Sequence, residues 1–199
     1  MQVLTYIMDT QEKILAAAFR LFSDRGYDST STRLIAKEAG VNEVTLFRHF
    51  GSKRELFDDV IRSQAEQRED LIDEVIEPTG DLKEDLVRFG IDINEILRDS
   101  SDLYKLLLFE VDRDPKIFEM ISHVPIKFIE KFSSYVVYAK DEGLIKEEVD
   151  AEVFTMAFFS FFFRAMIEKA FLGEGTIFKV GEEEIQGYVD ILVEGVEND

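Results

Sequence analysis

The apolar residues of this 199-residue chain recur at helical spacing along most of its length. The first stripe consists of Ile14, Leu15, Ala18, Phe19 and Phe22, which stand at i, i+1, i+4, i+5 and i+8. The strand-like segment "SSYVVYA" (133–139) lies in a helical context, and no segment alternates convincingly between polar and apolar positions. The pattern therefore predicts an all-α protein of about nine helices.

Capping and helix-stopping residues divide the first part of the chain into short helices. Asp9 or Thr10 can cap the first helix, and Gly26 ends it. Three more helices are expected at Arg33–Ala39, at Glu43–Phe50 after a cap at Asn42, and at 53–76 after the capping box "SKRE" (Ser52 with Glu55).

The rest of the chain predicts longer helices. The clearest break is "EPTGD" (77–81), and Asp114 with Pro115 restarts a helix. We expect Pro125 to break the chain again. The expected helices run to about Arg98, over 101–112, from Ile126 to Lys140, over 150–172, and from Glu182 to Val196.

The three short helices have the spacing of a helix-turn-helix unit. The apolar residues that would pack the second and third helices together are Ile35, Ala36, Ala39, Val41 and Leu46. Gly40 permits a positive φ at the turn between them. This packing would leave the outer face of 42–49 free to enter a DNA major groove, although any short amphipathic helix pair has similar spacing.

The stretch "ILAAAFRLFSDRGYDSTSTRLIAKEAGVNEVTLFRHFGSKRELFDDVI" is more specific, and it resembles the TetR (tetracycline repressor) family of transcriptional regulators. The resemblance covers residues 13–61. It implies a helix-turn-helix DNA-binding domain over 1–52 and a helical ligand-binding and dimerisation domain over 53–199. It also implies a homodimer that binds double-stranded DNA at a palindromic operator and is released by a hydrophobic or aromatic small molecule.

The resemblance assigns roles to residues of the DNA face. It places Thr32, Arg33 and Lys53 against phosphates, and it places Thr45, Arg48 and His49 in the recognition helix, where Asn42 is the cap. Phe47 stands where the family usually has Tyr, so the ring can pack on a sugar or a thymine methyl group but donates no hydrogen bond.

Glu43 and Val44 depart from the family pattern. Glu43 can accept a hydrogen bond from a cytosine amino group. The interpretation we favour is a first-turn carboxylate that interacts with the helix dipole or with a nearby Arg. Val44 can contact a thymine methyl group or narrow the approach to the groove.

The charge distribution supports DNA binding by the N-terminal part only. The formal charge of the chain is -19, whereas residues 1–62 hold nine Lys or Arg and nine Asp or Glu. The remainder is acidic and repels nucleic acid and membranes. The longest apolar run, "FTMAFFSFFF" (154–163), is too short to span a bilayer, so no membrane association is expected.

Composition also excludes classes of chemistry. The chain has no Cys and only two His, His49 and His123, and it shows no phosphate-binding loop or nucleophile motif. We therefore expect no metal, no cofactor and no enzymatic activity. The absence of Cys fits a cytoplasmic protein.

The segment 150–172 is apolar nearly all round, which predicts burial in a subunit interface, in the core of one chain, or in both. Phe159 and Phe163 are candidates for the interface. The predicted ligand contacts are Phe89, Phe109, Phe128, Phe132, Phe158, Phe162 and Arg164. The rings can instead form an ordinary aromatic core, and Arg164 can instead pair with an acid. The alternative function is a DNA-bound regulator that acts through a protein partner without a small-molecule effector.

Overall fold

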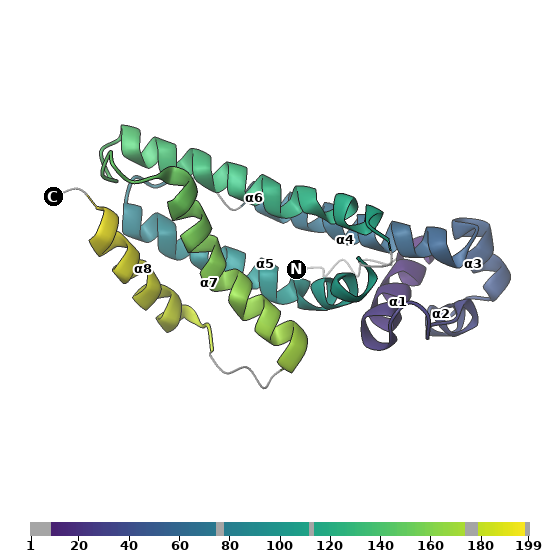
Figure 1. The fold of residues 1–199 in the computed structure, drawn as a ribbon. Helices are drawn as coiled ribbons and strands as arrows, with labels where there is room; N and C mark the ends of the chain where they lie inside the picture. The colour runs from purple at the N-terminus through teal and green to yellow at the C-terminus, as the bar shows by residue number, and fades with distance from the viewer. Residues whose placement is uncertain (1–8, 75–77, 112–113, 174–178, 198–199) are drawn as a thin grey trace, which may run out of the picture. The chain divides into compact units, whose positions relative to one another are not determined.

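The computed structural model describes residues 9–74, 78–111, 114–173 and 179–197, without the side chains of residues 73, 74, 108 and 109. Within these ranges the chain folds into eight helices and no strand, which confirms the all-α prediction (Figure 1). The helices are α1 (Thr10–Arg25), α2 (Thr32–Glu38), α3 (Glu43–Phe50), α4 (Lys53–Glu74), α5 (Leu82–Glu110), α6 (Lys116–Asp141), α7 (Ala151–Leu172) and α8 (Glu182–Val196).

The helices are divided between two compact units. The N-terminal unit comprises residues 1–65 and 106–121, and the C-terminal unit comprises 66–105 and 122–199. Three helices, α4, α5 and α6, are continuous from one unit into the other. The domain boundary predicted after residue 52 divides the chain differently and stays a prediction.

In the N-terminal unit, α1 is fixed at both ends by local hydrogen bonds. Asp9 and Glu12 form a capping box, in which the Asp9 side chain accepts from the Glu12 N–H at 2.9 Å and the Glu12 carboxylate accepts from the Asp9 N–H at 2.8 Å. The helix ends at Gly26, whose φ is +79°. The Phe22 ring then packs edge-on against the Phe57 ring of α4 at 5.2 Å between centroids.

The turn between α2 and α3 has the geometry that its sequence predicts. Ser31 caps α2 and Asn42 caps α3 through their side chains. Gly40 adopts a φ of +70°, and the Val41 N–H donates to the Ala36 carbonyl at 2.9 Å. The side chains of Ile35, Leu46 and Phe50 are buried, so the two helices are anchored through one face each.

The C-terminal unit has a core of closely packed aromatic rings. Phe132 of α6 lies at its centre, 4.4 Å from the Phe158 ring of α7 and 5.9 Å from the Phe89 ring of α5, centroid to centroid. These three rings are fully buried. Burial of large apolar side chains is the dominant favourable term in folding, so this cluster is a main source of the unit's stability.

A buried carboxylate lies within the same core. Asp85 of α5 is 0% exposed. One of its oxygens accepts from the N–H and the hydroxyl of Thr79, both at 2.8 Å, and the other accepts from the Tyr135 hydroxyl at 3.1 Å. Arg88 lies 3.4 Å from the first oxygen. Burial and the adjacent Asp85 carboxylate raise the pKa of Tyr135 well above its ordinary value, so the tyrosine donates as a neutral hydroxyl.

Two predicted helix breaks are wrong. The polar residues after Arg98 do not end a helix, because α5 runs through them to Glu110. Ser100 is buried inside the helix, where its hydroxyl donates to the Ile96 carbonyl at 2.6 Å. Pro125 does not break α6. A proline removes one helical hydrogen bond, and burial of Phe128 and Phe132 on the following turns outweighs that local loss.

Candidate functional site

The helix α3 presents a continuous exposed face. Val44 is 78% exposed and Phe47 is 42% exposed, and Arg48 lies one turn beyond Val44. His49 is also exposed. The opposite side of the helix, with Leu46 and Phe50, is buried. The structure therefore brings the predicted recognition residues to the surface of one short helix.

Asn42 and Thr45 belong to the start of this helix. The Asn42 side chain accepts from the Thr45 N–H at 2.7 Å, which confirms its role as the cap. The Asn42 side chain is exposed and that of Thr45 is half-buried. Both residues therefore border the exposed face rather than form its centre.

Glu43 contacts a neighbouring helix. Its carboxylate accepts a hydrogen bond from the Thr32 hydroxyl at 2.5 Å. This bond joins the first turn of α3 to the first turn of α2, and sequence reasoning did not predict it because the two residues lie 11 positions apart. The Thr32 hydroxyl has a single proton, so donation to a phosphate would require it to leave Glu43, whereas the Glu43 carboxylate keeps acceptor sites for a cytosine amino group.

Two of the predicted phosphate contacts lie on the helices before and after α3. Arg33 is exposed on the first turn of α2. Lys53, at the start of α4, donates to the Tyr27 carbonyl at 2.5 Å, and its ammonium lies 4.2 Å from the centre of the Tyr27 ring. Burial lowers the pKa of Lys53 from its ordinary value. An ammonium group has three N–H donors, so the bond to Tyr27 alone does not prevent a phosphate contact.

Arg54 connects α4 to the start of α6 within the N-terminal unit. Its guanidinium lies 2.5 Å from Asp114 and 2.9 Å from Asp58. Asp114 also accepts from the Lys116 N–H at 3.0 Å, so it caps α6 as the sequence predicts. The ion pair fixes the start of α6 beside the start of α4.

Most of the predicted effector residues are brought together in the core of the C-terminal unit. The buried rings among them are Phe89, Phe128, Phe132, Phe158 and Phe162. The side chain of Phe109 lies outside the described residues. Arg164 is 39% exposed and forms an ion pair with Glu168 one turn further along α7. None of these observations tests ligand binding, so the roles of all seven residues stay predictions.

Sequence reasoning missed a buried arginine in the same unit. Arg68 of α4 is only 8% exposed and lies at a cavity of ≈ 20 Å³. Of the predicted effector residues, Phe128 lines this cavity. A signal was present in the sequence, because Arg68 stands three residues after Ala65 and four before Ile72, on the buried face of α4.

The helices α7 and α8 pack together through aromatic contacts. The Phe161 and Tyr188 rings stack at 4.2 Å between centroids, and the Tyr188 hydroxyl donates to the Ala157 carbonyl at 2.6 Å. On the outside of this helix pair, Val153, Met156 and Ile191 are 65%, 57% and 71% exposed. The pair thus carries apolar side chains that the described residues of the chain leave exposed.

Other kinds of site are absent from the described part of the chain. The residues there form no group of three or more His, Cys, Asp or Glu side chains able to hold a metal ion. Likewise, no helix within the described ranges has the length and hydropathy to cross a membrane.

Comparison with known proteins adds independent evidence on the N-terminal region. Residues 14–60 match the model of the bacterial regulatory proteins of the tetR family. Over 197 residues the chain is 28% identical to the uncharacterized HTH-type transcriptional regulator YvkB of Bacillus subtilis. This alignment covers 96% of this chain and 98% of YvkB. Over 52 residues it is 35% identical to IcaR of Staphylococcus aureus, a negative transcriptional regulator of the biofilm operon icaADBC, covering 26% and 28% of the two chains.

The fold extends the similarity beyond the N-terminal region. A TetR-family transcriptional regulator from Mesorhizobium loti has a similar structure, with a TM-score of 0.73 and 24% identity over 94% of each chain. The family model covers the helices that carry the exposed α3 face, and the whole-chain matches cover the rest. Residues 14–60 are therefore a helix-turn-helix domain of the tetR family of bacterial regulatory proteins, and the chain as a whole has the fold of TetR-family regulators.

Proposed function

We propose that this regulator is a cytoplasmic repressor that binds a near-palindromic operator as a homodimer and leaves it when a hydrophobic small molecule binds the C-terminal unit. The exposed face of α3 is the observation that supports DNA binding. Val44, Phe47 and Arg48 project from a helix whose other side is anchored, which is the arrangement needed to enter a major groove.

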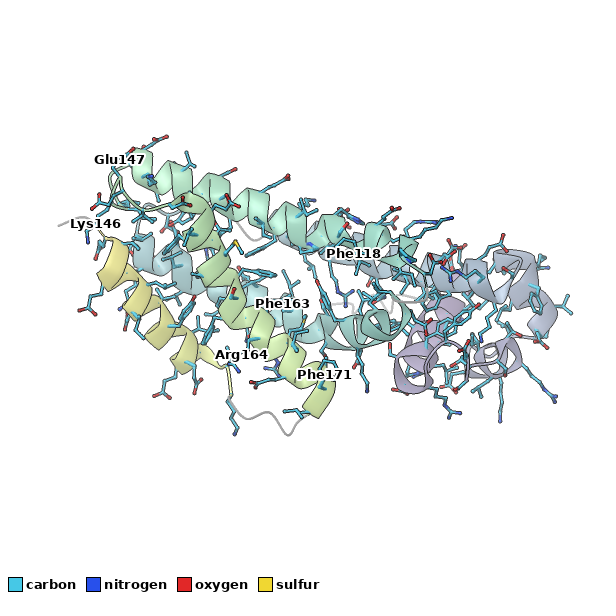
Figure 2. All side chains as sticks on the ribbon, viewed as in Figure 1. Phe118, Lys146, Glu147, Phe163, Arg164 and Phe171 are labelled. Atoms are coloured by element: carbon cyan, nitrogen blue, oxygen red, sulfur yellow. The ribbon has the colours of Figure 1, made fainter. Side chains whose placement is uncertain are left out.

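The dimer is supported by the exposed apolar side chains of α7 and α8. Ile191 is flanked one turn away on each side by Gly187 and Gly195, and a Cβ added at either glycine would meet no atom within 4 Å. A second helix can therefore approach closely around Ile191. Figure 2 shows Phe163, Arg164 and Phe171 along α7, and Phe171 is 59% exposed. A second copy of the pair would cover this surface in a four-helix interface.

Phe159 and Phe163 are less suited to this interface than their sequence pattern suggests. Both are half-buried. The Phe159 ring lies 5.4 Å from the Phe128 ring, and the Phe163 ring lies 6.0 Å from the Tyr104 ring, both within the same unit. Substitutions meant to separate subunits therefore belong at Met156 and Ile191.

Light scattering tests the dimer. The wild type is expected at twice the chain mass of 23.0 kDa at micromolar concentration. Met156→Glu combined with Ile191→Glu is expected to shift the protein to monomer, because it buries charge in an apolar interface. Val137→Glu, at an exposed position of α6, is the matched control and is expected to remain dimeric. A monomeric wild type would contradict the proposal.

The operator follows from the dimer. A two-fold dimer presents two α3 helices, so the half-sites are expected about one helical turn, or roughly 34 Å, apart. Selection of bound duplexes from a random-sequence pool identifies the operator, and mobility shifts measure affinity for it. Recovery of sequences without two-fold symmetry would count against the proposed mode of binding.

Release by an effector is supported by the path of α4. This helix carries Lys53 at its first turn, in the N-terminal unit, and Arg68 at the cavity of the C-terminal unit. TetR-family regulators bind DNA and small-molecule effectors and form dimers. A ligand that prefers one arrangement of α4 would change operator affinity, with a coupling free energy of about 1–3 kcal/mol. Calorimetric titration of candidate hydrophobes with and without operator measures that coupling.

The second candidate is a regulator that acts through a protein partner. A surface groove of ≈ 730 Å³ between α5 and α8 has more acidic than basic side chains in its lining, with Asp81, Glu84, Asp92 and Glu197 against Lys83 and Arg88. Such a groove suits a basic segment of another protein. If no hydrophobe changes operator affinity, and a basic partner recovered with the protein does, this candidate replaces the effector mechanism.

A further inference from the structure

A charged side chain is enclosed in the apolar core of the C-terminal unit. Arg68 is more than nine-tenths buried, within a unit whose core otherwise consists mainly of aromatic and aliphatic side chains. Removing a guanidinium from water is costly unless its environment compensates. Burial lowers the pKa of Arg68, and Tyr104 and Asp99 oppose that shift. Arg68 nevertheless keeps its charge at neutral pH, since an arginine is effectively always protonated.

Polar groups from α5 surround the guanidinium on one side of the cavity. The Arg68 Nε–H donates to the Ser100 hydroxyl at 2.6 Å, and an Nη2–H donates to the Asp99 carbonyl at 3.0 Å. Tyr104, one turn after Ser100, also lines the cavity, and burial raises the pKa of its hydroxyl. At this side of the cavity a fixed cation therefore lies next to two hydroxyl groups.

The remaining walls of the cavity are apolar. They include Ile72, Ile93, Leu97, Phe128 and Phe159, which come from α4, α5, α6 and α7. A site with one charged corner and otherwise hydrocarbon walls matches a ligand with one anionic group and an apolar remainder.

Resting on the proposed effector function, we propose that the effector is an amphiphilic carboxylate. Arg68 binds its carboxylate together with the Tyr104 hydroxyl, and the apolar walls take its hydrocarbon part. This assignment gives the buried charge a role beyond stability. It also explains how a strongly acidic protein can hold an anion, because the positive charge lies inside the unit.

Binding is an exchange of partners. The Ser100 hydroxyl and the Asp99 carbonyl now accept from Arg68, and a carboxylate accepts the same N–H groups with the added attraction of opposite charges. An alcohol of the same chain length offers only a neutral acceptor. Hydrogen bonds that involve charged groups are stronger than neutral ones by enough to make the preference for carboxylate about tenfold or more.

The cavity must enlarge for this ligand. Its volume of ≈ 20 Å³ is about enough for a single water molecule. Pro125 lines it from α6 and lacks the backbone N–H of a helical residue, so that turn of the helix has one hydrogen bond fewer to hold it. Ligand entry therefore displaces the side chains that line the cavity and moves α6 at the turn that contains Pro125. α4 transmits this displacement from the cavity to Lys53 at its first turn.

The experiment compares matched probes on the full-length protein. Saturated carboxylates of eight to sixteen carbons and the primary alcohols of the same lengths are titrated calorimetrically into the wild type, Arg68→Met, Arg68→Lys and Arg98→Met. Arg98→Met makes the same change at an exposed position of α5 and is the matched control. Thermal melting confirms that each variant is folded.

For at least one chain length, the wild type is expected to bind the carboxylate about tenfold or more tightly than the alcohol. Arg68→Met is expected to lose this preference with little change for the alcohol, whereas Arg68→Lys and Arg98→Met retain it. If Arg68→Met does not fold, the carboxylate assignment is still tested by the preference of the wild type for carboxylate over alcohol and by whether Arg68→Lys keeps that preference.

Equal affinity of the wild type for carboxylates and alcohols, or loss of the preference in Arg98→Met, overturns the carboxylate assignment. Operator mobility shifts with the same probes separate this result from failure of the proposed function. If alcohols release the operator and carboxylates do not, only the carboxylate assignment fails. If no probe of either series binds, the carboxylate assignment is again overturned, and operator release by an unrelated hydrophobe would keep the effector mechanism.

Discussion

The N-terminal unit keeps the basic groups of α2 and α3 at the surface, whereas the C-terminal unit encloses an arginine and an aspartate in its core. Arg48 and Arg33 are exposed, while Asp85 and Arg68 are 0% and 8% exposed. The exposed groups retain their hydration until a partner approaches. The buried ones have lost theirs on folding, so they depend on fixed hydrogen bonds.

Exposed and buried charged side chains have different roles in this protein. At the surface, long-range attraction to phosphates raises affinity for any DNA, and it is weakened by salt. In the core, a charge fixes the geometry of the groups around it, as Asp85 does for Thr79 and Tyr135. The same substitution is therefore expected to act on DNA binding in one unit and on stability in the other.

The largest effect is expected from Asp85→Ala. It leaves the buried Tyr135 hydroxyl and the Thr79 N–H without their acceptor, so the free energy of unfolding should fall by about 3 kcal/mol. Asp59→Ala is the surface counterpart, since Asp59 pairs with Arg62 at 2.9 Å where both side chains are exposed, and it should cost less than about 1 kcal/mol. Urea unfolding followed by circular dichroism measures both. Equal losses would remove the contrast between the units.

An intermediate effect is expected from Lys53→Ala. If Lys53 contacts a phosphate, binding to all duplexes should weaken, and the slope of log affinity against log salt should become shallower by about one unit. Lys179→Ala removes the same charge from an exposed position in the C-terminal unit and should leave the slope unchanged. Thr45→Ala and His49→Ala are expected to act partly on specificity instead. Mobility shifts over a salt series give the slopes.

Lys53 also donates a hydrogen bond to the Tyr27 carbonyl, so a structural role of Lys53 must be separated from a phosphate contact. Lys53→Arg keeps the charge and should restore most of the salt dependence. A lower melting temperature for Lys53→Ala with an unchanged slope would assign the residue to the fold alone.

The smallest effect is expected from Glu43→Gln. Its side chain keeps an oxygen that accepts from Thr32 but loses the negative charge beside the recognition face. Affinity for all duplexes should therefore rise by up to about 1 kcal/mol at low salt. If Glu43 instead reads a cytosine, the variant should lose affinity for the selected operator and tolerate changes at one base pair. Mobility shifts on single-base variants of the operator distinguish these results.

The N-terminal unit was the more predictable of the two because its structure depends on neighbours in sequence. Asp9, Asn42 and Gly40 act within a few residues of their own position, and each has the predicted cap or turn geometry. The exposed face of α3 then follows from the period of the helix and the burial of Leu46 and Phe50. The partner of Glu43 was not predictable in this way, because it lies on another helix.

The all-α class, the helix-turn-helix unit and the acidic character of the remainder are readable from the amino-acid sequence, since they depend on period, local capping and composition. The continuity of α5 and α6, and the meeting of Arg68 of α4 with Ser100 and Tyr104 of α5, depend on how distant helices pack. A local signal for a helix end is worth about 1 kcal/mol, and burial of a large side chain is worth more. The contacts between helices distant in sequence therefore overrule the local signals in the core, and they alone bring the buried polar groups together.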